Sequence, residues 1–216
     1  MRSILVIAGA SGVGKTTVAD ALIKKYGIFG LVRSITTRAP RGDGHDGEYI
    51  YADRDGFIKK AESGELVEYM EYGGNMYGTP VSELERVFSD EKIPLLILDI
   101  EGVKSLRKRS FDFNSVIVYI WDELNIIEKR LYARDLAEPT SEKLLSFIRR
   151  KEMNIRDYLS MPGIAHLFDS YVRNEGIEEC AASVKSVFDR VNRGEVLSPE
   201  EKDKTASALF EMAKCK

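Results

Sequence analysis

Short apolar runs alternate with segments of helical spacing along much of the chain. The runs Ser3 to Ala8 (SILVIA), Pro94 to Ile100 (PLLILDI) and Ser115 to Ile120 (SVIVYI) are almost wholly apolar. Such runs are typical of parallel strands that are covered on both faces. A further strand is expected over Leu31 to Ile35. Strands that alternate with helices predict an α/β fold with a parallel sheet and right-handed crossovers.

Three segments carry clear helix signals. Thr16 to Tyr26 has apolar residues at helical spacing and a stop signal at Gly27, and Ile177 to Val191 has the same spacing. In the C-terminal tail, residues 196–216, Ser198 and Pro199 have the residue types of an N-cap and a first helical position. The tail is therefore expected to be helical, packed either on the core or on another subunit.

Two regions interrupt this alternation. Along ELVEYMEYGGNMYG, tyrosine and glutamate alternate and glycine breaks the apolar runs, which predicts a small, mostly antiparallel lobe over residues 34–80. From Asp122 to Leu159 the pattern is helical except around ARDLAEPTSE, where Pro139 ends one helix and Ser141 can begin the next. We expect a domain over residues 1–195, with a core of residues 1–33 and 81–195, the inserted lobe and a lid over about residues 130–150.

Composition narrows the class of protein. The 216 residues suit one sizeable domain, and 32 basic against 35 acidic side chains argue against a general nucleic-acid binder. Cys180 and Cys215 match no metal-ligand spacing, which favours a reducing compartment. The apolar run in MRSILVIAGA is too short for a membrane span. A cytoplasmic protein without nucleic-acid or membrane partners is expected.

The segment GASGVGKT, Gly9 to Thr16, satisfies the G-x-x-x-x-G-K-[ST] pattern between a predicted strand and a predicted helix. Backbone N–H groups of such a turn, with the helix N-terminus, attract a polyphosphate. Lys15 is expected at the β and γ phosphates, Thr16 at Mg²⁺ and Thr17 at the α phosphate. The alternative is a glycine-rich connector that binds nothing. The predicted ATP-binding residues are Gly9, Ala10, Ser11, Gly12, Val13, Gly14, Lys15, Thr16 and Thr17.

A second anion site is predicted in SITTRAPRGDGHDGEYIY. Arg38 and Arg41 flank Pro40, which stiffens the segment, and an arginine fork suits a phosphate dianion. Tyr49 and Tyr77 could add phenolic donors. The alternative for any single arginine is a solvated surface side chain.

These segments together resemble the guanylate kinase family. GASGVGKT, SITTRAPR, GELVE, YGT, LILDIE and FDSYVRN occur in the family's order and at about its spacings over residues 3–191. The resemblance implies a P-loop nucleoside monophosphate kinase with an ATP-binding core, an inserted GMP-binding lobe and a mobile lid. It implies transfer of the γ-phosphoryl group of Mg·ATP to GMP, and more weakly to dGMP, in purine nucleotide metabolism.

By this resemblance Arg38, Arg41, Tyr49 and Tyr77 would bind the GMP phosphate, and Ser34, Glu68 and Thr79 would read guanine. A carboxylate accepts hydrogen bonds from N1–H and the 2-amino group of guanine, whereas adenine offers a lone pair at N1. A site built for such hydrogen bonds rejects a ligand that lacks them. Asp99 and Glu101 are also assigned to the GMP site, and Asp99 to the Mg²⁺ shell with Thr16.

The resemblance also assigns catalytic roles to Lys15, Arg38 and three lid arginines. Arg130 and Arg134 are four residues apart and so share a helix face. Arg150 is the third, with Arg149 an alternative. Each could instead be a surface charge partner. The chain departs from the family pattern in DIEGV, where Glu101 replaces aspartate after a shorter connection, and in a longer lid.

Two rival interpretations stay open at this stage. One is a related P-loop kinase that acts on another small phosphorylated acceptor, such as a ribose bisphosphate. The other is a non-catalytic module that binds phosphopeptides through the arginines and tyrosines of the second anion site. The intact Lys15 and Thr16 favour the enzyme. Either a monomer or a homodimer is compatible with the sequence.

Overall fold

The computed structural model describes residues 2–40, 47, 49–72, 74–137, 139–195 and 198–215. Its main sheet is parallel and has the strand order β2-β7-β1-β8-β9. The strands are β1 (Arg2–Gly9), β2 (Phe29–Leu31), β7 (Ile93–Leu98), β8 (Phe113–Trp121) and β9 (Ser170–Arg173). The predicted α/β fold with a parallel sheet is confirmed.

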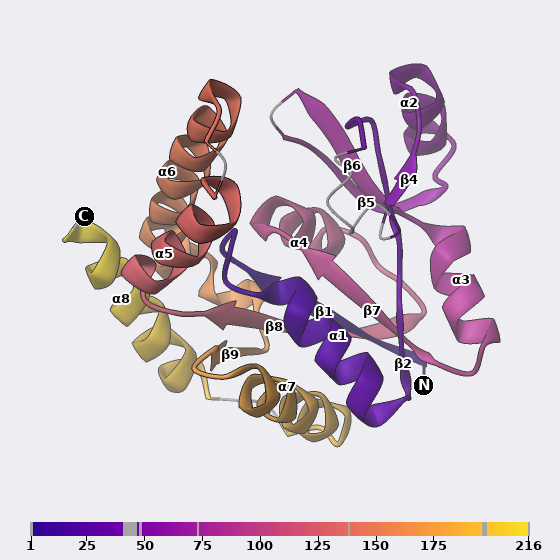
Figure 1. Cartoon of the computed structure of the whole chain (residues 1–216). Helices are drawn as coiled ribbons and strands as arrows, with labels where there is room; N and C mark the ends of the chain where they lie inside the picture. The colour runs from indigo at the N-terminus through magenta and orange to yellow at the C-terminus, as the bar shows by residue number, and fades with distance from the viewer. Residues whose placement is uncertain are drawn as a thin grey trace.

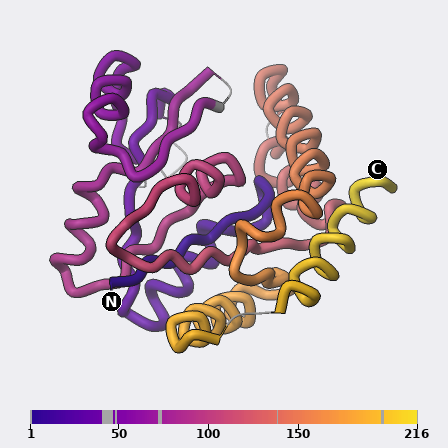
Figure 2. The backbone as a smooth tube through the Cα atoms, turned by 180° about the vertical axis from the view of Figure 1, so that it is seen from behind, coloured from indigo at the N-terminus to yellow at the C-terminus, as the bar shows by residue number. Residues whose placement is uncertain are grey.

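The central strand β1 is apolar because both of its faces are covered. Residues Ile4 to Ala8 and, on the neighbouring strand, Val116 to Ile120 are fully buried. Helix α1 (Lys15–Tyr26) and helix α7 (Ile177–Asn192) pack side by side over one face of the sheet. Helices α4 (Ile100–Arg107) and α8 (Pro199–Lys214) lie over the other face (Figures 1 and 2). The burial explains why these strands lack the polar alternation of a half-exposed sheet.

A second sheet of four strands follows the order β4-β3-β6-β5. Its strands are β3 (Ser34–Thr36), β4 (Tyr49–Tyr51), β5 (Leu66–Tyr72) and β6 (Asn75–Pro80). The pairs β3–β6 and β5–β6 are antiparallel, and β3–β4 is parallel. Ile35 and Leu66 form a small separate core with Phe57 of helix α2 (Arg54–Glu62). Helix α3 (Val81–Ser89) leads back to the main sheet.

The prediction of one strand over Leu31 to Ile35 is wrong. The chain instead leaves the main sheet at the end of β2 and enters the second sheet at Ser34. Val32 still donates its N–H to Leu95 O (3.0 Å), whereas the Arg33 guanidinium pairs with Glu83 at the start of α3 (2.7 Å). Hydrophobicity alone did not reveal this break, because both flanking strands are short.

The helical region after β8 divides as predicted. Helix α5 (Leu124–Asp135) and helix α6 (Ser141–Ile164) are separated by a polar break, and Thr140 caps α6 by accepting a hydrogen bond from Lys143 N (3.2 Å). The short 3₁₀ helix η2 (Ala165–Leu167) links α6 to β9. None of the described helices combines the length and apolar character that a membrane span requires.

The C-terminal tail packs back on its own chain. Helix α8 starts with a capping box between Ser198 and Glu201, with Pro199 in the first turn, as the sequence predicts. It contacts α6, η2 and β9 (Figure 2). Ala206, Leu209 and Ala213 are the buried residues of this helix. Of the two positions expected for the tail, the structure therefore shows the one on the core.

Candidate active site

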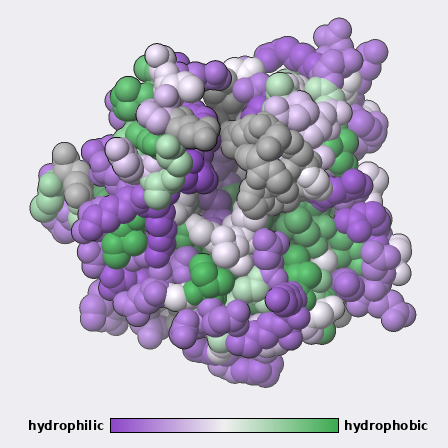
Figure 3. Space-filling model, in the orientation of Figure 1, coloured by the Kyte–Doolittle hydropathy of each residue, from purple (hydrophilic) through white to green (hydrophobic). Residues whose placement is uncertain are grey.

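A cavity of about 190 Å³ lies between the carboxyl edge of the main sheet and the second sheet. Figure 3 shows this face of the molecule hollowed between helices α5 and α6 and the second sheet. The lining residues come from both sheets and from the first turns of α1 and α4. They are Lys15, Ser34, Tyr49, Glu68, Met70, Tyr77, Gly78, Ile97, Leu98, Asp99 and Gly102.

Six of these lining residues were predicted from the sequence, namely Lys15, Ser34, Tyr49, Glu68, Tyr77 and Asp99. The other five were not predicted as site residues, although Gly78, Ile97 and Leu98 lie within the quoted segments YGT and LILDIE. All five are apolar and of residue types that are common throughout the chain. They are Met70, Gly78, Ile97, Leu98 and Gly102. Their position in the cavity follows from strand register and from the start of α4. The available sequence signal was that they lie close in sequence to predicted site residues.

The glycine-rich loop joins β1 to α1 as predicted. Gly12 and Gly14 have φ values of 84° and 102°, which favour glycine. At Gly9 an added Cβ would lie 2.3 Å from Ile120 O, so a side chain cannot fit there. Because α1 begins at Lys15, its first-turn N–H groups have no acceptor within the helix. The loop and this helix end therefore form a concavity that suits an anion.

The Lys15 side chain is folded back on the loop. Its Nζ donates hydrogen bonds to Gly9 O (2.7 Å) and Ala10 O (3.0 Å). Burial lowers the pKa of Lys15 to about 8, although the carboxylates of Asp99 and Asp157 oppose this shift. The Lys15 amine is thus held by two backbone carbonyls in the lining of the cavity.

The side chains of two asparagines bind the backbone of the glycine-rich loop. Asn154 of α6 makes two hydrogen bonds to the backbone of Ser11, and Asn174 Nδ2 donates to Val13 O (2.7 Å). Asn174 belongs to the FDSYVRN segment quoted above, whereas Asn154 was missed. A polar residue in a long, charge-rich helix carries no sequence signal of such a contact.

Glu68 is the buried carboxylate of the second sheet. Its side chain accepts a hydrogen bond from Thr79 Oγ1 (2.7 Å), and the two residues are paired between β5 and β6. Only 2% of Glu68 is exposed. Burial raises its pKa to about 8, while the bond from Thr79 and the charge of Arg109 act in the opposite direction. Gly102 leaves room for the carboxylate, because a Cβ there would lie 3.2 Å from Glu68 Oε2.

Asp99 lies at the end of β7 and caps α4. Its Oδ1 accepts a hydrogen bond from Gly102 N (2.8 Å). Burial raises the pKa of Asp99 above its ordinary value, whereas the Gly102 bond and the charge of Lys15 lower it. Glu101, in the first turn of the same helix, is exposed and pairs with Lys104 (2.7 Å). It does not line the cavity, and its assignment to the GMP site stays a prediction.

The predicted phosphate-binding arginines are only partly described. Arg38 lies with its guanidinium 5.1 Å from the ring centroid of Tyr49 and donates to Ala39 O (3.0 Å). Tyr49 lines the cavity, so this contact places Arg38 at its edge. The prediction for Arg41 falls outside the described residues.

The arginines predicted for a lid separate into two groups. Arg134 Nε pairs with Asp135 Oδ1 (2.8 Å), and Arg150 NH1 lies 3.8 Å from Asp135 Oδ2. The charges of Arg134 and Arg150 both lower the pKa of Lys15, which indicates that they lie near the loop. Arg149, the alternative to Arg150, is exposed.

Arg130 contacts the back of the loop instead. Its guanidinium pairs with Asp122 Oδ2 (3.0 Å) and donates to Val13 O (3.4 Å) and Asn174 O (3.3 Å). In this arrangement it supports the glycine-rich loop at Val13. The catalytic role expected for it stays a prediction.

The two predicted metal ligands, Thr16 and Asp99, could hold Mg²⁺ only together with further ligands such as phosphate oxygens and water. Within the described ranges, no group of three or more His, Cys, Asp or Glu residues could hold a metal ion. Thr16 and Asp99 carry oxygen donors, which Mg²⁺ prefers, and Mg²⁺ usually takes its other ligands from phosphates and water. Asp157 of α6 is a further carboxylate near Lys15, and burial raises its pKa to about 7. No sequence motif marks this residue as a ligand.

Comparison with known proteins gives a consistent result. The family model described as guanylate kinase matches residues 1–191. A guanylate kinase of Thermus thermophilus is 33% identical over 186 residues, which cover 86% of this chain and 80% of that protein. The human guanylate kinase is 28% identical over 187 residues, with 85% of this chain and 91% of that protein covered.

The plant relatives are longer, and a solved structure supports the fold. Guanylate kinase 1 of Arabidopsis thaliana is 32% identical over 187 residues, and the match covers 85% of this chain but 46% of that protein. This chain thus spans about half the length of that relative. The crystal structure of guanylate kinase from Anaplasma phagocytophilum has a TM-score of 0.62 at 24% identity, covering 93% of this chain and 89% of that one.

Proposed function

This chain belongs to the guanylate kinase family, and we propose that it transfers the γ-phosphoryl group of Mg·ATP to GMP, and more weakly to dGMP, to form GDP. The observation that carries the proposal is a single cavity lined by both Lys15 of the ATP loop and the buried Glu68 of the second sheet. One cavity can therefore bring a triphosphate and a purine monophosphate together. Phosphoryl transfer needs this positioning more than covalent help from the protein.

Glu68 would read the guanine base. Once ionised on binding guanine, its carboxylate would accept hydrogen bonds from N1–H and the 2-amino group. Thr79 has a single hydroxyl hydrogen, which is donated to Glu68 in the structure. While that bond is kept, Thr79 orients the carboxylate, and Ser34 is the hydroxyl that can donate to O6 of guanine. Arg38 and Arg41 would hold the GMP phosphate, together with Tyr49 and Tyr77.

Charge around the moving phosphoryl group would come from several cations. Bound Mg²⁺ would neutralise charge on the β and γ phosphates, with Thr16 and Asp99 as its protein partners. Lys15 Nζ has one N–H beyond the two donated to Gly9 O and Ala10 O, and it could donate all three to the same phosphates after leaving those carbonyls. Arg134 and Arg150 are the lid cations whose charges act on Lys15, and closure of the lid would exclude water from the site. Glu101 and Arg130 are retained as candidates of the GMP and catalytic sites.

We assign the parts of the chain accordingly. The core comprises residues 1–33 and 81–195, the GMP-binding lobe residues 34–80, the lid about residues 130–150 and the tail residues 196–216. Cys180 and Cys215 are both free, which supports a cytoplasmic location. The proposed partners are the nucleotides ATP and GMP, without nucleic acid or membrane, and the reaction belongs to purine nucleotide metabolism.

Initial rates with GMP, IMP and AMP test this assignment. We expect a preference for GMP over AMP on the order of 10⁴, with IMP between them because it has N1–H but no 2-amino group. Glu68→Gln should remove most of this preference. Glu71→Gln is the matched control, since Glu71 is an exposed glutamate on the same strand that pairs with Arg54. Equal rates on the three monophosphates would refute the role of Glu68.

A further inference from the structure

Asn154 lies in the middle of α6 and faces the back of the ATP loop. Only 2% of the residue is exposed. Its Oδ1 accepts the Ser11 N–H (2.8 Å), and its Nδ2 donates to Ser11 O (2.9 Å). One side-chain amide therefore binds both polar groups of a single backbone residue, as a neighbouring strand would.

This contact acts where the loop has most backbone freedom. Ser11 is followed by Gly12, and Gly14 comes two residues later, and glycine allows more backbone conformations than other residues. Val13, between the two glycines, is held through its carbonyl by Asn174 and Arg130. Leu131 of α5 lies directly behind Gly12, where an added Cβ would be 2.6 Å from Leu131 Cγ. Packing thus limits how far Gly12 can move, and the amide of Asn154 fixes the orientation of the preceding residue.

The same helix also carries residues that face the nucleotide side of the loop. Arg150 lies one turn before Asn154 and pairs with Asp135, and Asp157 lies one turn after it and interacts with Lys15. Helix α6 therefore contacts the glycine-rich loop through Asn154 at its middle and the C-terminal end of α5 through Arg150.

We propose that Asn154 is a positioning residue for ATP. It holds Ser11 so that the N–H groups from Gly12 to Thr16 keep the orientation that a polyphosphate needs. The inference rests on the proposed function in one respect, that ATP is the ligand of this loop. If the loop is held in its binding-competent form for only part of the time, the apparent affinity for ATP falls by that fraction.

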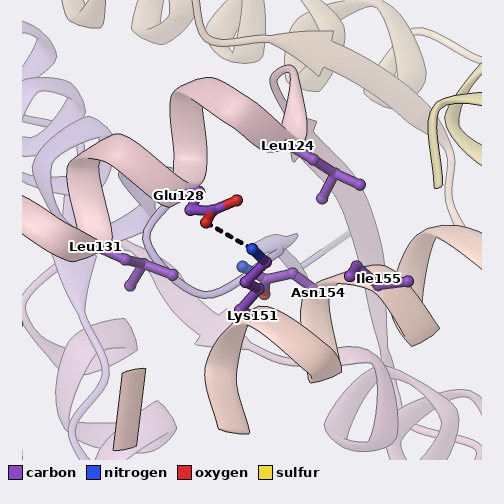
Figure 4. Close-up of a pocket in the computed structure, with 6 residues that line it drawn as sticks. All are labelled: Leu124, Glu128, Leu131, Lys151, Asn154 and Ile155. Atoms are coloured by element: carbon purple, nitrogen blue, oxygen red, sulfur yellow. Dashed lines mark hydrogen bonds and ion pairs between the residues drawn. The ribbon is translucent and has the colours of Figure 1, made fainter. Parts of the chain in front are cut away.

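A merely structural role for Asn154 predicts a different result. The residue also borders a small cavity between α5 and α6, with Leu124, Leu131 and Ile155 (Figure 4). Across that cavity Lys151 Nζ pairs with Glu128 Oε1 (2.6 Å) and ties the two helices together. If α6 acted only through its packing on α5, loss of this ion pair would affect ATP binding as much as loss of the asparagine.

Calorimetry of ATP and, separately, of GMP tests the proposal on the full chain. We expect Asn154→Ala to weaken ATP binding about tenfold or more, and to leave GMP binding within about twofold. Lys151→Met, the control on the same helix, should leave both affinities within about twofold. The melting temperature of each variant is measured in parallel to establish that it is folded.

A second variant keeps the test valid if Asn154→Ala does not fold. Asn154→Asp has nearly the same shape and can still accept the Ser11 N–H, but its ionised carboxylate cannot donate to Ser11 O. It should weaken ATP binding at least as much as the alanine variant. Unchanged ATP affinity in both variants, or equal losses for ATP and GMP, would overturn the inference. Failure of the unaltered protein to bind ATP would instead refute the proposed function.

Discussion

Glu68 combines its proposed role in guanine recognition with an electrostatic cost to the folded protein. Its carboxyl group is buried beside Asp99, and its pKa is raised from the ordinary 4.5 to about 8. Between these two pH values the folded protein holds a proton that the unfolded chain has lost. The free energy of unfolding therefore falls as the pH rises from about 4.5 to about 8. Hydrogen bonds from a bound guanine would offset part of this cost.

The pH dependence of stability tests this account. Glu68→Gln removes the titrating group but keeps the shape and an acceptor oxygen. We expect the variant to melt at a higher temperature than the unaltered protein at pH 8.5, with a difference that shrinks towards pH 5. Thermal unfolding followed by circular dichroism measures this. Glu71→Gln should show no such trend, and a difference independent of pH would contradict the burial argument.

At the scale of secondary-structure elements, Asp99 belongs both to a helix and to the cavity. It ends β7, caps α4 through Gly102 N and lines the site. An N-cap side chain satisfies a backbone N–H that has no intrahelical acceptor, and asparagine replaces aspartate in this role with little loss. The stability and functional contributions of Asp99 can therefore be separated by the choice of substitution.

We expect Asp99→Asn and Asp99→Ala to differ in stability but not in activity. The alanine variant should be about 1 kcal/mol less stable than the asparagine variant, because it loses the cap. Both should lower kcat by about 10-fold to 100-fold, since both remove the carboxylate near the proposed Mg²⁺ shell. Urea unfolding and steady-state rates provide the two measurements. Full activity in Asp99→Asn would show that the charge is not required.

At the scale of the whole molecule, the C-terminal helix completes the packing around α6. Helix α8 lies beyond residues 1–191, which match the family, yet it buries Ala206 and Leu209 completely and Ala213 almost so. Because α6 also carries Asn154 and Arg150, the helix outside the family region supports an element that reaches the ATP loop.

Truncation of Leu209 measures this support. We expect Leu209→Ala to lower the free energy of unfolding by about 2–5 kcal/mol, the usual range for a buried leucine. Leu145→Ala is the matched control, because Leu145 lies on α6 but is 54% exposed, and its effect should stay within about 0.5 kcal/mol. Urea denaturation of both variants gives the comparison. A small effect at Leu209 would mean that α8 is only loosely attached.

Much of the architecture and part of the site could be predicted from local pattern. The apolar runs around SILVIA and SVIVYI predict buried parallel strands, because only a doubly covered strand lacks polar alternation. Gly27 and Ser198 mark helix ends through backbone chemistry that is local to the chain, and the structure confirms both. The glycine-rich loop is likewise defined by residues that are adjacent in sequence.

Tertiary structure alone decided the contacts between distant segments. Nothing near Asn154 in the sequence indicates that it binds Ser11, 143 residues away. Register between β5 and β6 brought Glu68 to Thr79, and the start of α4 turned Glu101 outward onto Lys104. The sequence determined which residue types and local turns were available, because propensity and capping act over a few residues. Which side chains share one cavity depends on how the two sheets and α6 pack, and that packing joins residues far apart in the chain.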